Sequence, residues 1–469
     1  MTYNFDTTYT RLNNKLYQFL NLPQIEDPHI LLLNSPLIGQ LGINYSDDRS
    51  PQKLLGIDSS ERPFAQAYAG HQFGYFTVLG DGRAMILGEH ITPDKERFDI
   101  QLKGSGTTKY SRGGDGKATV TSMIREYLYS QALKNLNIDS SQSLAVITTG
   151  QRVMRNTVQD GAVLIRVMKS HIRFGTFEYV SKFCSSQDLK HFADYVIERH
   201  YPELTDECDR YLSFFRAVLE NTIRMVVQWY RVGFIHGVMN TDNMSITGET
   251  FDYGPCSFIN YYDPSKTFSS IDTYGRYSFG NQRQILRWNL SVLGITLLPL
   301  INSDADKAAF LVKKELDTFD ACFDSHFLKM MKCKLGITDP GPHDQIIASI
   351  LQFLKINKSD YTNTFIEIMQ PGTFEDAVYQ TDEFKVLREE INRQGGDLKL
   401  MAENNPQHIL RNHLVEQALQ EYENTGSLDK VTELLKATAS PYTKNKGFSR
   451  FQIPPSYDFD NNYRTHCNT

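Results

Sequence analysis

Side chains that could bind a metal ion and accept a proton are concentrated between residues 234 and 254. Asn243 and Asp252 lie nine positions apart in this stretch. Amide and carboxylate oxygens are the ligands that Mg²⁺ prefers. Asp242 directly precedes Asn243, and its carboxylate could accept a proton from a reacting hydroxyl group. The three residues therefore predict a metal site with a proton acceptor beside it.

The order of these residues follows the metal-binding motifs of protein kinases. Kinases carry His-Arg-Asp, an Asn five positions after that Asp, and then Asp-Phe-Gly. Here His236 takes the first position and Asp252-Tyr-Gly254 the last. Val238 stands where kinases have the catalytic Asp, and valine cannot accept a proton. The pattern predicts a kinase-like metal site with a displaced base; the alternative is a pair of ordinary turn sequences.

A lysine and a glutamate upstream are placed as a kinase ion pair would require. Apolar and polar residues alternate over 98–103, which predicts a strand that ends at Lys103. Residues 118–136 have helical periodicity and include Glu126. In kinases such a pair fixes the lysine against the phosphates of ATP. The alternative is a solvated lysine and a surface glutamate.

Two glycine-rich segments flank this strand. Apolar, strand-like runs lie on both sides of Gly80-Asp-Gly82, which predicts a hairpin. The second segment, 104–116, follows Lys103 and could bind phosphate oxygens through its backbone amides. Kinases have their glycine loop before the lysine, so this is neither a standard kinase loop nor a Walker motif. A purely structural use of these glycines is the alternative.

Two arginines follow at the end of the N-terminal part. Arg166 interrupts an apolar strand predicted over 162–168, and Arg173 lies in the next short loop. Guanidinium groups bind phosphate oxygens in a bidentate way. Two arginines are more than the single phosphate contact of a kinase requires. The alternative is that they form structural salt bridges.

Length and composition limit the number of lobes, the binding partners and the location of the protein. The 469 residues exceed the ~250 to 300 at which a single core stops growing, so two lobes are expected. A net charge of −6 offers no basic field for nucleic acid or an anionic membrane. The start lacks the features of a signal or transit peptide, and the apolar run 292–301 is too short to span a bilayer. The cytoplasm is therefore the expected location, and the six cysteines, which are sparse and form no Cys-x-x-Cys pair, fit its reducing conditions.

Six segments of this chain together resemble the selenoprotein O family of kinase-fold protein adenylyltransferases. They are residues 68–74, 79–84, 101–106, 170–178, 236–245 and 252–255. The resemblance implies an α+β, protein-kinase-like bilobal fold. We expect an N-terminal extension (1–60), an N-lobe with nucleotide-binding loops (61–180), a C-lobe with the catalytic and metal-binding loops (181–340), and a helical C-terminal extension (341–469).

The resemblance also implies an activity. ATP would bind in a flipped orientation, so that AMP rather than phosphate passes to Ser, Thr or Tyr hydroxyls of protein substrates. Lys103, Arg166 and Arg173 would hold the outer phosphates, with Glu126 steadying Lys103. Asn243 and Asp252 would hold Mg²⁺, with Mn²⁺ as the alternative, and Asp242 would accept the proton. The other residues expected to line the nucleotide, together with Asp252, are Gly80, Gly82, Arg83, Asp115 and Gly116.

One position departs from the family pattern. Members often carry a Cys after Asp-Tyr-Gly that can bond to a residue near the C-terminus, whereas this chain has Phe268 there. Cys467 remains, so the redox switch is expected to be absent unless Cys256 replaces the missing thiol. Two other functions stay open from the residues alone, an ATP-dependent kinase and a non-catalytic ATP-binding protein. The oligomeric state is also open.

Overall fold

The first half of the chain is built around an antiparallel sheet. The computed structural model describes residues 2–45, 50–155, 157–341 and 343–465. Seven strands pair in the order β1-β3-β6-β7-β9-β8-β2. They are β1 (Tyr17–Phe19), β2 (His29–Leu33), β3 (Phe64–Gln66), β6 (Ala84–Ile91), β7 (Arg97–Lys103), β8 (Gln142–Met154) and β9 (Val158–Met168). β7 lies at the centre and carries Lys103, as the alternating pattern predicts.

Residues 1–60 supply both edges of this sheet. β1 pairs with β3 at one edge, and β2 pairs with β8 at the other. The short helices α1 (Ser35–Leu41) and α2 (Pro51–Leu54) follow β2. The sequence analysis expected this segment to be an N-terminal extension. Its strands complete the hydrogen bonding of β3 and β8 and so join the sheet.

The structure has no hairpin across Gly80–Gly82, so this prediction is wrong. β5 (Tyr75–Val78) pairs with β4 (Ala69–Gln72) in a separate two-stranded sheet, whereas β6 pairs with β3 and β7. The intervening Asp81 explains the difference. Its backbone N–H donates to Gln66 O at 2.9 Å, and its carboxylate accepts from Gln66 N at 2.9 Å. These bonds hold the turn against β3. The strands on its two sides, β5 and β6, therefore belong to different sheets.

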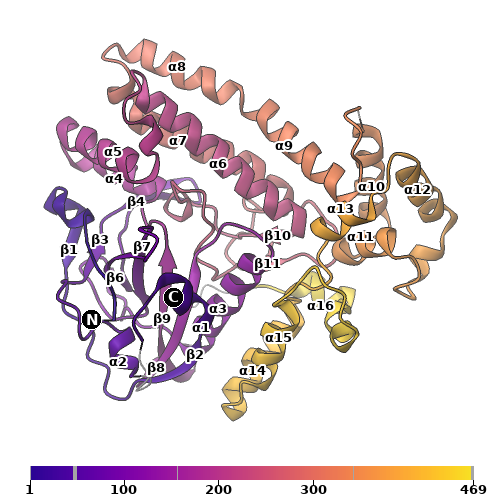
Figure 1. Cartoon of the computed structure of the whole chain (residues 1–469), viewed down its shortest axis with the longest axis horizontal. Coiled ribbons are helices and arrows are strands. Elements are labelled where there is room, and N and C mark those ends of the chain that lie inside the picture. Colours follow the sequence, from indigo (N-terminus) through magenta and orange to yellow (C-terminus); the bar gives the residue numbers. More distant parts are fainter. Residues whose placement is uncertain (1, 46–49, 156, 342, 466–469) are drawn as a thin grey trace.

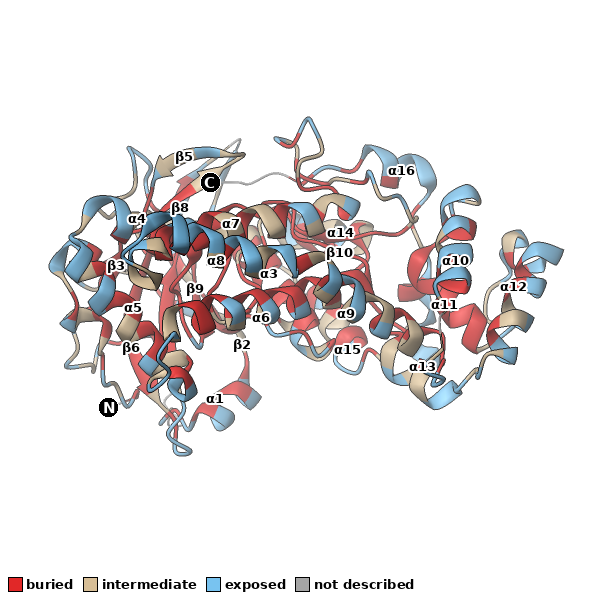
Figure 2. Ribbon diagram, turned by 90° about the horizontal axis from the view of Figure 1, so that it is seen from above, coloured by how far each residue is buried: buried red, intermediate tan, exposed pale blue. Residues whose placement is uncertain are grey.

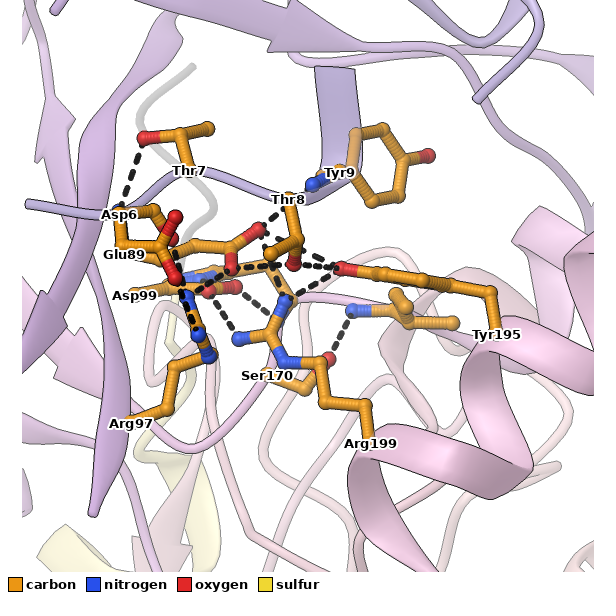
Figure 3. Close-up of polar contacts among 12 residues, drawn as sticks. Asp6, Thr7, Thr8, Tyr9, Glu89, Arg97, Asp99, Ser170, Tyr195 and Arg199 are labelled. Atoms are coloured by element: carbon orange, nitrogen blue, oxygen red, sulfur yellow. Dashed lines mark hydrogen bonds and ion pairs between the residues drawn. The ribbon is translucent and has the colours of Figure 1, made fainter. Parts of the chain in front are cut away.

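An ion-pair network fixes the N-terminal segment and the first lobe to a helix of the second (Figure 3). Arg97 of β7 binds Asp6 at 2.7 Å and Glu89 of β6 at 3.0 Å. Arg199 of α5 (Ser186–His200) binds Glu89 at 3.0 Å and Asp99 at 2.6 Å. Buried carboxylates of this kind need such partners, because unpaired charge inside a protein is costly. The network therefore holds α5 against the sheet.

Helices form the rest of the molecule (Figure 1). α3 (Val120–Asn135) packs on β8 and β9, with Thr119 accepting from Ser122 N as its N-cap. The second lobe contains α4 (Phe174–Phe183), α5, α6 (Arg210–Val232), α7 (Gln282–Ile301), α8 (Ala305–Asp317) and α9 (Phe319–Lys334). Gly233, with φ of +75°, ends α6 in the left-handed conformation that favours glycine.

The C-terminal part is helical as well. It contains α10 (Asp344–Ile356), α11 (Tyr361–Met369), α12 (Asp382–Arg393), α13 (Leu398–Asn404), α14 (Asn412–Thr425), α15 (Asp429–Thr438) and α16 (Tyr457–Asn462). In Figure 2 buried residues follow the inner sides of the helices, and exposed residues follow the outer sides. The molecule thus has a lobe that contains the sheet, a helical lobe and a helical C-terminal region. This arrangement is the α+β, kinase-like fold that the sequence predicts.

One segment has the composition of a membrane span. Phe279–Ile301 reaches the necessary length with a mean hydropathy of 1.4. It ends with α7, which packs against α4, α6 and α8. A core helix passes the same test, and these three neighbours account for the apolar character of the segment.

The C-terminal strap, residues 463–465, lies against the position of the missing thiol. Phe268 is fully buried and its ring is 5.8 Å from that of Tyr463. Thr465 N donates to Phe268 O at 2.7 Å, and Ser270 N donates to Thr465 O at 3.0 Å. Cys256 is buried, which raises its pKa strongly, and Cys467 lies outside the described residues. The absence of a redox switch therefore stays a prediction.

Candidate active site

A cavity of about 370 Å³ lies between the sheet and the loop that follows α6. Nine of the predicted site residues line it, namely Gly82, Arg83, Lys103, Glu126, Arg166, Arg173, Asp242, Asn243 and Asp252. The loop is held by the short strands β10 (Phe234–Ile235) and β11 (Ser257–Phe258), which pair with each other. A larger cavity of about 780 Å³ lies beside the network of Figure 3 and contains none of these residues.

Two cations converge on one carboxylate of the cavity. Lys103 contacts Glu126 of α3 directly, as the order of the elements predicts, and its Nζ lies 2.7 Å from Asp252 Oδ1. Arg166 of β9 lies 2.8 Å from Glu126 and 2.6 Å from Asp252. Burial alone would raise the pKa of Asp252, but Arg166 and Lys103 hold it well below its ordinary value. Asp252 is therefore ionised, and its φ of +65° is a strained conformation typical of functional sites.

Arg173 adds a third cation from the start of α4. Its Nη1 donates to the backbone oxygen of Asp242 at 2.8 Å. Its guanidinium lies 3.5 Å from Asp81 and 3.6 Å from Asp252, and 4.2 Å from the centre of the Tyr68 ring. These contacts fix the side chain in one orientation, so its positive charge is directed into the cavity before any ligand binds.

One carboxylate oxygen of Asp242 is buried without a hydrogen-bond partner. The residue lies in a 3₁₀ turn over Thr241–Asn243 and is only 6% exposed. Oδ2 accepts a long hydrogen bond of 3.4 Å from Gln72, while Oδ1 has no hydrogen-bond partner among the described residues. Burial raises the pKa of Asp242 to about 6, although Arg173 opposes the rise. A carboxylate with this pKa in the lining of the cavity is suited to accept a proton near neutral pH.

A close backbone approach makes this position of Asp242 possible. A Cβ on Gly70 of β4 would lie 2.5 Å from Asp242 Oδ1. His71 N, the next donor along β4, bonds to Thr241 Oγ1 at 2.7 Å. Only glycine at position 70 therefore lets β4 lie directly on the loop that carries Asp242.

The oxygens of Asn243 and Asp252 fit a magnesium site. Asn243 Nδ2 donates to Val238 O at 3.0 Å, which leaves the amide oxygen of Asn243 available as a ligand. No group of three or more His, Cys, Asp or Glu side chains with metal-binding geometry occurs in the part of the chain that the structure describes. Mg²⁺ commonly takes one or two protein ligands and completes its shell with water and phosphate oxygens. Two protein oxygens are within what the ion commonly takes, and binding of Mg²⁺ by these residues stays a prediction.

Three predicted nucleotide contacts lie outside the lining of the cavity. Asp115 forms a bidentate pair with Arg155 at 2.9 and 3.0 Å. Gly116, with φ of +66°, leaves room for Gly106 O, which a Cβ would approach to 2.1 Å. A Cβ on Gly80 would lie 2.3 Å from the Tyr110 ring, which packs there. These contacts give each residue a structural role, and their contact with nucleotide stays a prediction.

His236, the first residue of the kinase-like motif, has a structural position. Its Nε2 lies 2.9 Å from Phe251 O, and its ring is 5.4 Å from that of Trp229. Burial lowers the pKa of His236, so the neutral ring holds the segment before Asp252 against α6.

Other residues of the cavity were missed by the sequence analysis. Asp81 is 2% exposed, and burial raises its pKa to about 6 despite the nearby Arg173. Tyr68 and Gln72 contact Arg173 and Asp242 respectively. All three lie within segments that the motif analysis singled out. Periodicity could not show that their side chains turn into the cavity.

Comparison with known proteins gives a consistent result. The sequence matches the family described as "Protein adenylyltransferase SelO" over residues 1–439. A relative from Nitrosococcus oceani, "Protein nucleotidyltransferase YdiU", is 43% identical over 97% of this chain and 95% of its own length. The proteins of the same name from Brevibacillus brevis and Alkaliphilus metalliredigens are 42% and 43% identical over 100% of this chain and 98% of theirs.

Solved structures give weaker similarities. The kinase domain of a Toxoplasma gondii rhoptry antigen has 13% identity and a TM-score of 0.24, covering 71% of this chain and 84% of that chain. ROP2 from the same organism, described as a protein-kinase fold without enzymatic activity, has 12% identity and a TM-score of 0.24, covering 73% and 84%.

Proposed function

The chain belongs to the SelO family of protein adenylyltransferases, and from this premise we propose that it moves AMP from ATP to Ser, Thr or Tyr hydroxyls of proteins. Pyrophosphate would be the other product. The observation that carries this proposal is the convergence of Lys103, Arg166 and Arg173 on one cavity that also contains Asp242 with an unpaired oxygen.

The three cations suit a triphosphate whose outer phosphates leave. In the free protein their charges are balanced by Glu126, Asp252 and Asp81, so they are already in place when ATP binds. As the bond between the α-phosphorus and the bridging oxygen breaks, that oxygen keeps the electron pair and negative charge grows on pyrophosphate. Preorganised positive charge at such a position lowers the barrier by several kcal/mol.

Asp242 would accept the proton of the attacking hydroxyl group. The hydroxyl oxygen forms the new bond to the α-phosphorus, and its proton passes to the carboxylate. Val238 lines the cavity at the position of the kinase base and has no group that could do this. Nothing in the contacts of the cavity favours the kinase alternative.

Asn243 and Asp252 would hold Mg²⁺, or Mn²⁺, which neutralises phosphate charge when bound. Gly82 and Arg83 line the cavity and would contact the nucleotide. Gly80, Asp115 and Gly116 belong to two segments that touch through Tyr110. These residues would line the nucleotide if it extends along that contact.

The position of the label in ATP tests this proposal. ATP labelled at the α-phosphate and ATP labelled at the γ-phosphate are each incubated with the protein, Mg²⁺ and a protein mixture. We expect label on protein from the α position only, because AMP is the group transferred. Label from the γ position only would show an ordinary kinase, and the assignments of Arg166 and Arg173 would be withdrawn.

The transfer rate should fall as the pH drops below about 6. Asp242 accepts a proton only in its ionised form, and burial raises its pKa to about 6. At pH 5 about a tenth of the molecules would carry the ionised form. The measurement is kcat/KM for transfer between about pH 5 and pH 8.

Asp81 is the matched control for this profile, since burial raises its pKa to about 6 as well. An Asp81→Asn variant should keep the same acidic limb, whatever its absolute rate. If the limb disappears in this variant, the titrating group is Asp81 rather than Asp242.

A further inference from the structure

Two segments meet at the mouth of the catalytic cavity. One is residues 73–75, which are the turn after β4 and the first residue of β5, and the other is the loop 271–276. They touch where Gly74 lies against Arg276, because a Cβ on this glycine would be 3.7 Å from the guanidinium carbon. Phe73 and Ile271, one from each segment, line the cavity itself. We call residues 73–75 and 271–276 the lip.

The lip is fixed relative to the proposed base. Phe73 N donates to Asn240 Oδ1 at 3.2 Å, and the neighbouring Gln72 donates to Asp242. The Phe73 ring packs 5.1 Å from that of Tyr277, which follows the second segment of the lip. A chain lying across the lip would therefore have a defined position relative to the carboxylate of Asp242.

Apolar side chains of the lip are exposed to an unusual degree. Tyr274 is 97% exposed, Tyr75 is 79% exposed and Ile271 is 58% exposed. Neither tyrosine has a ring contact or hydrogen bond from its side chain among the residues that the structure describes. Large apolar side chains grouped on a surface mark interaction sites, and Tyr is enriched among the residues that dominate binding.

Positive charge beside the lip forms no ion pair in the described ranges. The Arg276 guanidinium stacks 4.9 Å from the Trp288 ring and forms no ion pair. Lys182 of α4 places its Nζ 3.8 Å from the centre of the Phe76 ring and likewise forms no ion pair. The nearby carboxylate of Asp272 accepts from the backbone N–H groups of residues 276 and 277, at 2.8 Å each. Lys182 also acts on the carboxylate of Glu178 in the same helix, but neither cation is held in an ion pair, so both can contact an external anion.

Resting on the proposed function, we propose that the lip binds the segment of the protein substrate that carries the acceptor hydroxyl, and that this segment is acidic. Its apolar side chains would contact Ile271 and Tyr274, and its carboxylates would bind Arg276 and Lys182. The chemistry of the lip thus selects a substrate class, namely hydroxyl groups flanked by Asp or Glu.

Matched acceptor peptides test this inference. Each peptide carries one Tyr in the same apolar context, flanked either by Asp and Glu or by Asn and Gln, and AMP transfer is measured from the mass of the product. We expect kcat/KM to be about tenfold higher for the acidic peptide, because one hydrogen bond to a charged group typically contributes enough free energy for a tenfold change. Equal values for the two peptides would overturn the inference. Absence of AMP on both peptides, with ATP still bound, would instead overturn the proposed function.

Variants of the lip give the second arm of the test. Lys182→Glu should remove the preference for the acidic peptide, and Tyr274→Ser should lower kcat/KM for both peptides without changing the affinity for ATP. Tyr274 is almost fully exposed, so this change costs no packing. Lys355→Glu on α10, at the other end of the molecule (Figure 1), is the charge-matched control. An equal effect of Lys355→Glu would show that net charge, not the lip, decides the preference.

Discussion

Replacing Asp242 with asparagine should lower the rate of AMP transfer by about 10²- to 10⁴-fold, the contribution usual for a general base. Asparagine keeps the shape of the side chain but cannot accept the proton. Gln72 and Arg173 contact Asp242 in ways that an amide can largely keep, since the arginine binds the backbone oxygen. The affinity for ATP should therefore stay close to that of the unmodified protein.

The measurement pairs single-turnover transfer with ATP binding at equilibrium. Asp81→Asn is the matched control, because Asp81 is also a buried carboxylate of the cavity with a pKa raised to about 6. It faces Arg173 and the backbone of Gln66 rather than the attacking hydroxyl group, so this variant should lose far less of its transfer rate than Asp242→Asn. A wild-type rate for Asp242→Asn would remove Asp242 from its assigned role.

The second large effect is expected at Asp252. Asp252→Asn would remove an anion that contacts both Lys103 and Arg166, and with it one of the two proposed metal ligands. Transfer should fall by about 10³-fold, since charge stabilisation by a bound metal is worth several kcal/mol and each 1.4 kcal/mol is about tenfold. Unlike Asp242→Asn, this variant should also lose the dependence of ATP affinity on Mg²⁺.

Binding of ATP with and without Mg²⁺ separates the two variants. The fold should survive Asp252→Asn, because the change is isosteric and Lys103 and Arg166 keep Glu126 as a partner. A melting curve provides that control. If ATP affinity in Asp252→Asn still rose with Mg²⁺ as in the unmodified protein, the proposed metal ligands would be wrong.

Most elements near the site could be predicted because their signals are local. The alternation that ends at Lys103 and the helical spacing around Glu126 identify β7 and α3, and the order of these elements was enough to pair the two residues. The prediction of a hairpin across Gly80–Gly82 was wrong because strand pairing is not a local property. Glycines indicate a turn, but the partner of each strand depends on the bonds of Asp81 to Gln66, which no local pattern contains.

By itself, the sequence determined the residue types available for chemistry, the elements that carry them and the family that their motifs resemble. The tertiary structure alone decided how they act on one another. Arg166 and Asp252 are 86 positions apart and Arg173 and Asp242 are 69 positions apart, yet their contacts set the charge of the cavity. The raised pKa of Asp242 requires burial beneath Gly70. Burial and charge depend on distances in space, and periodicity along the chain records only which face of an element a residue occupies.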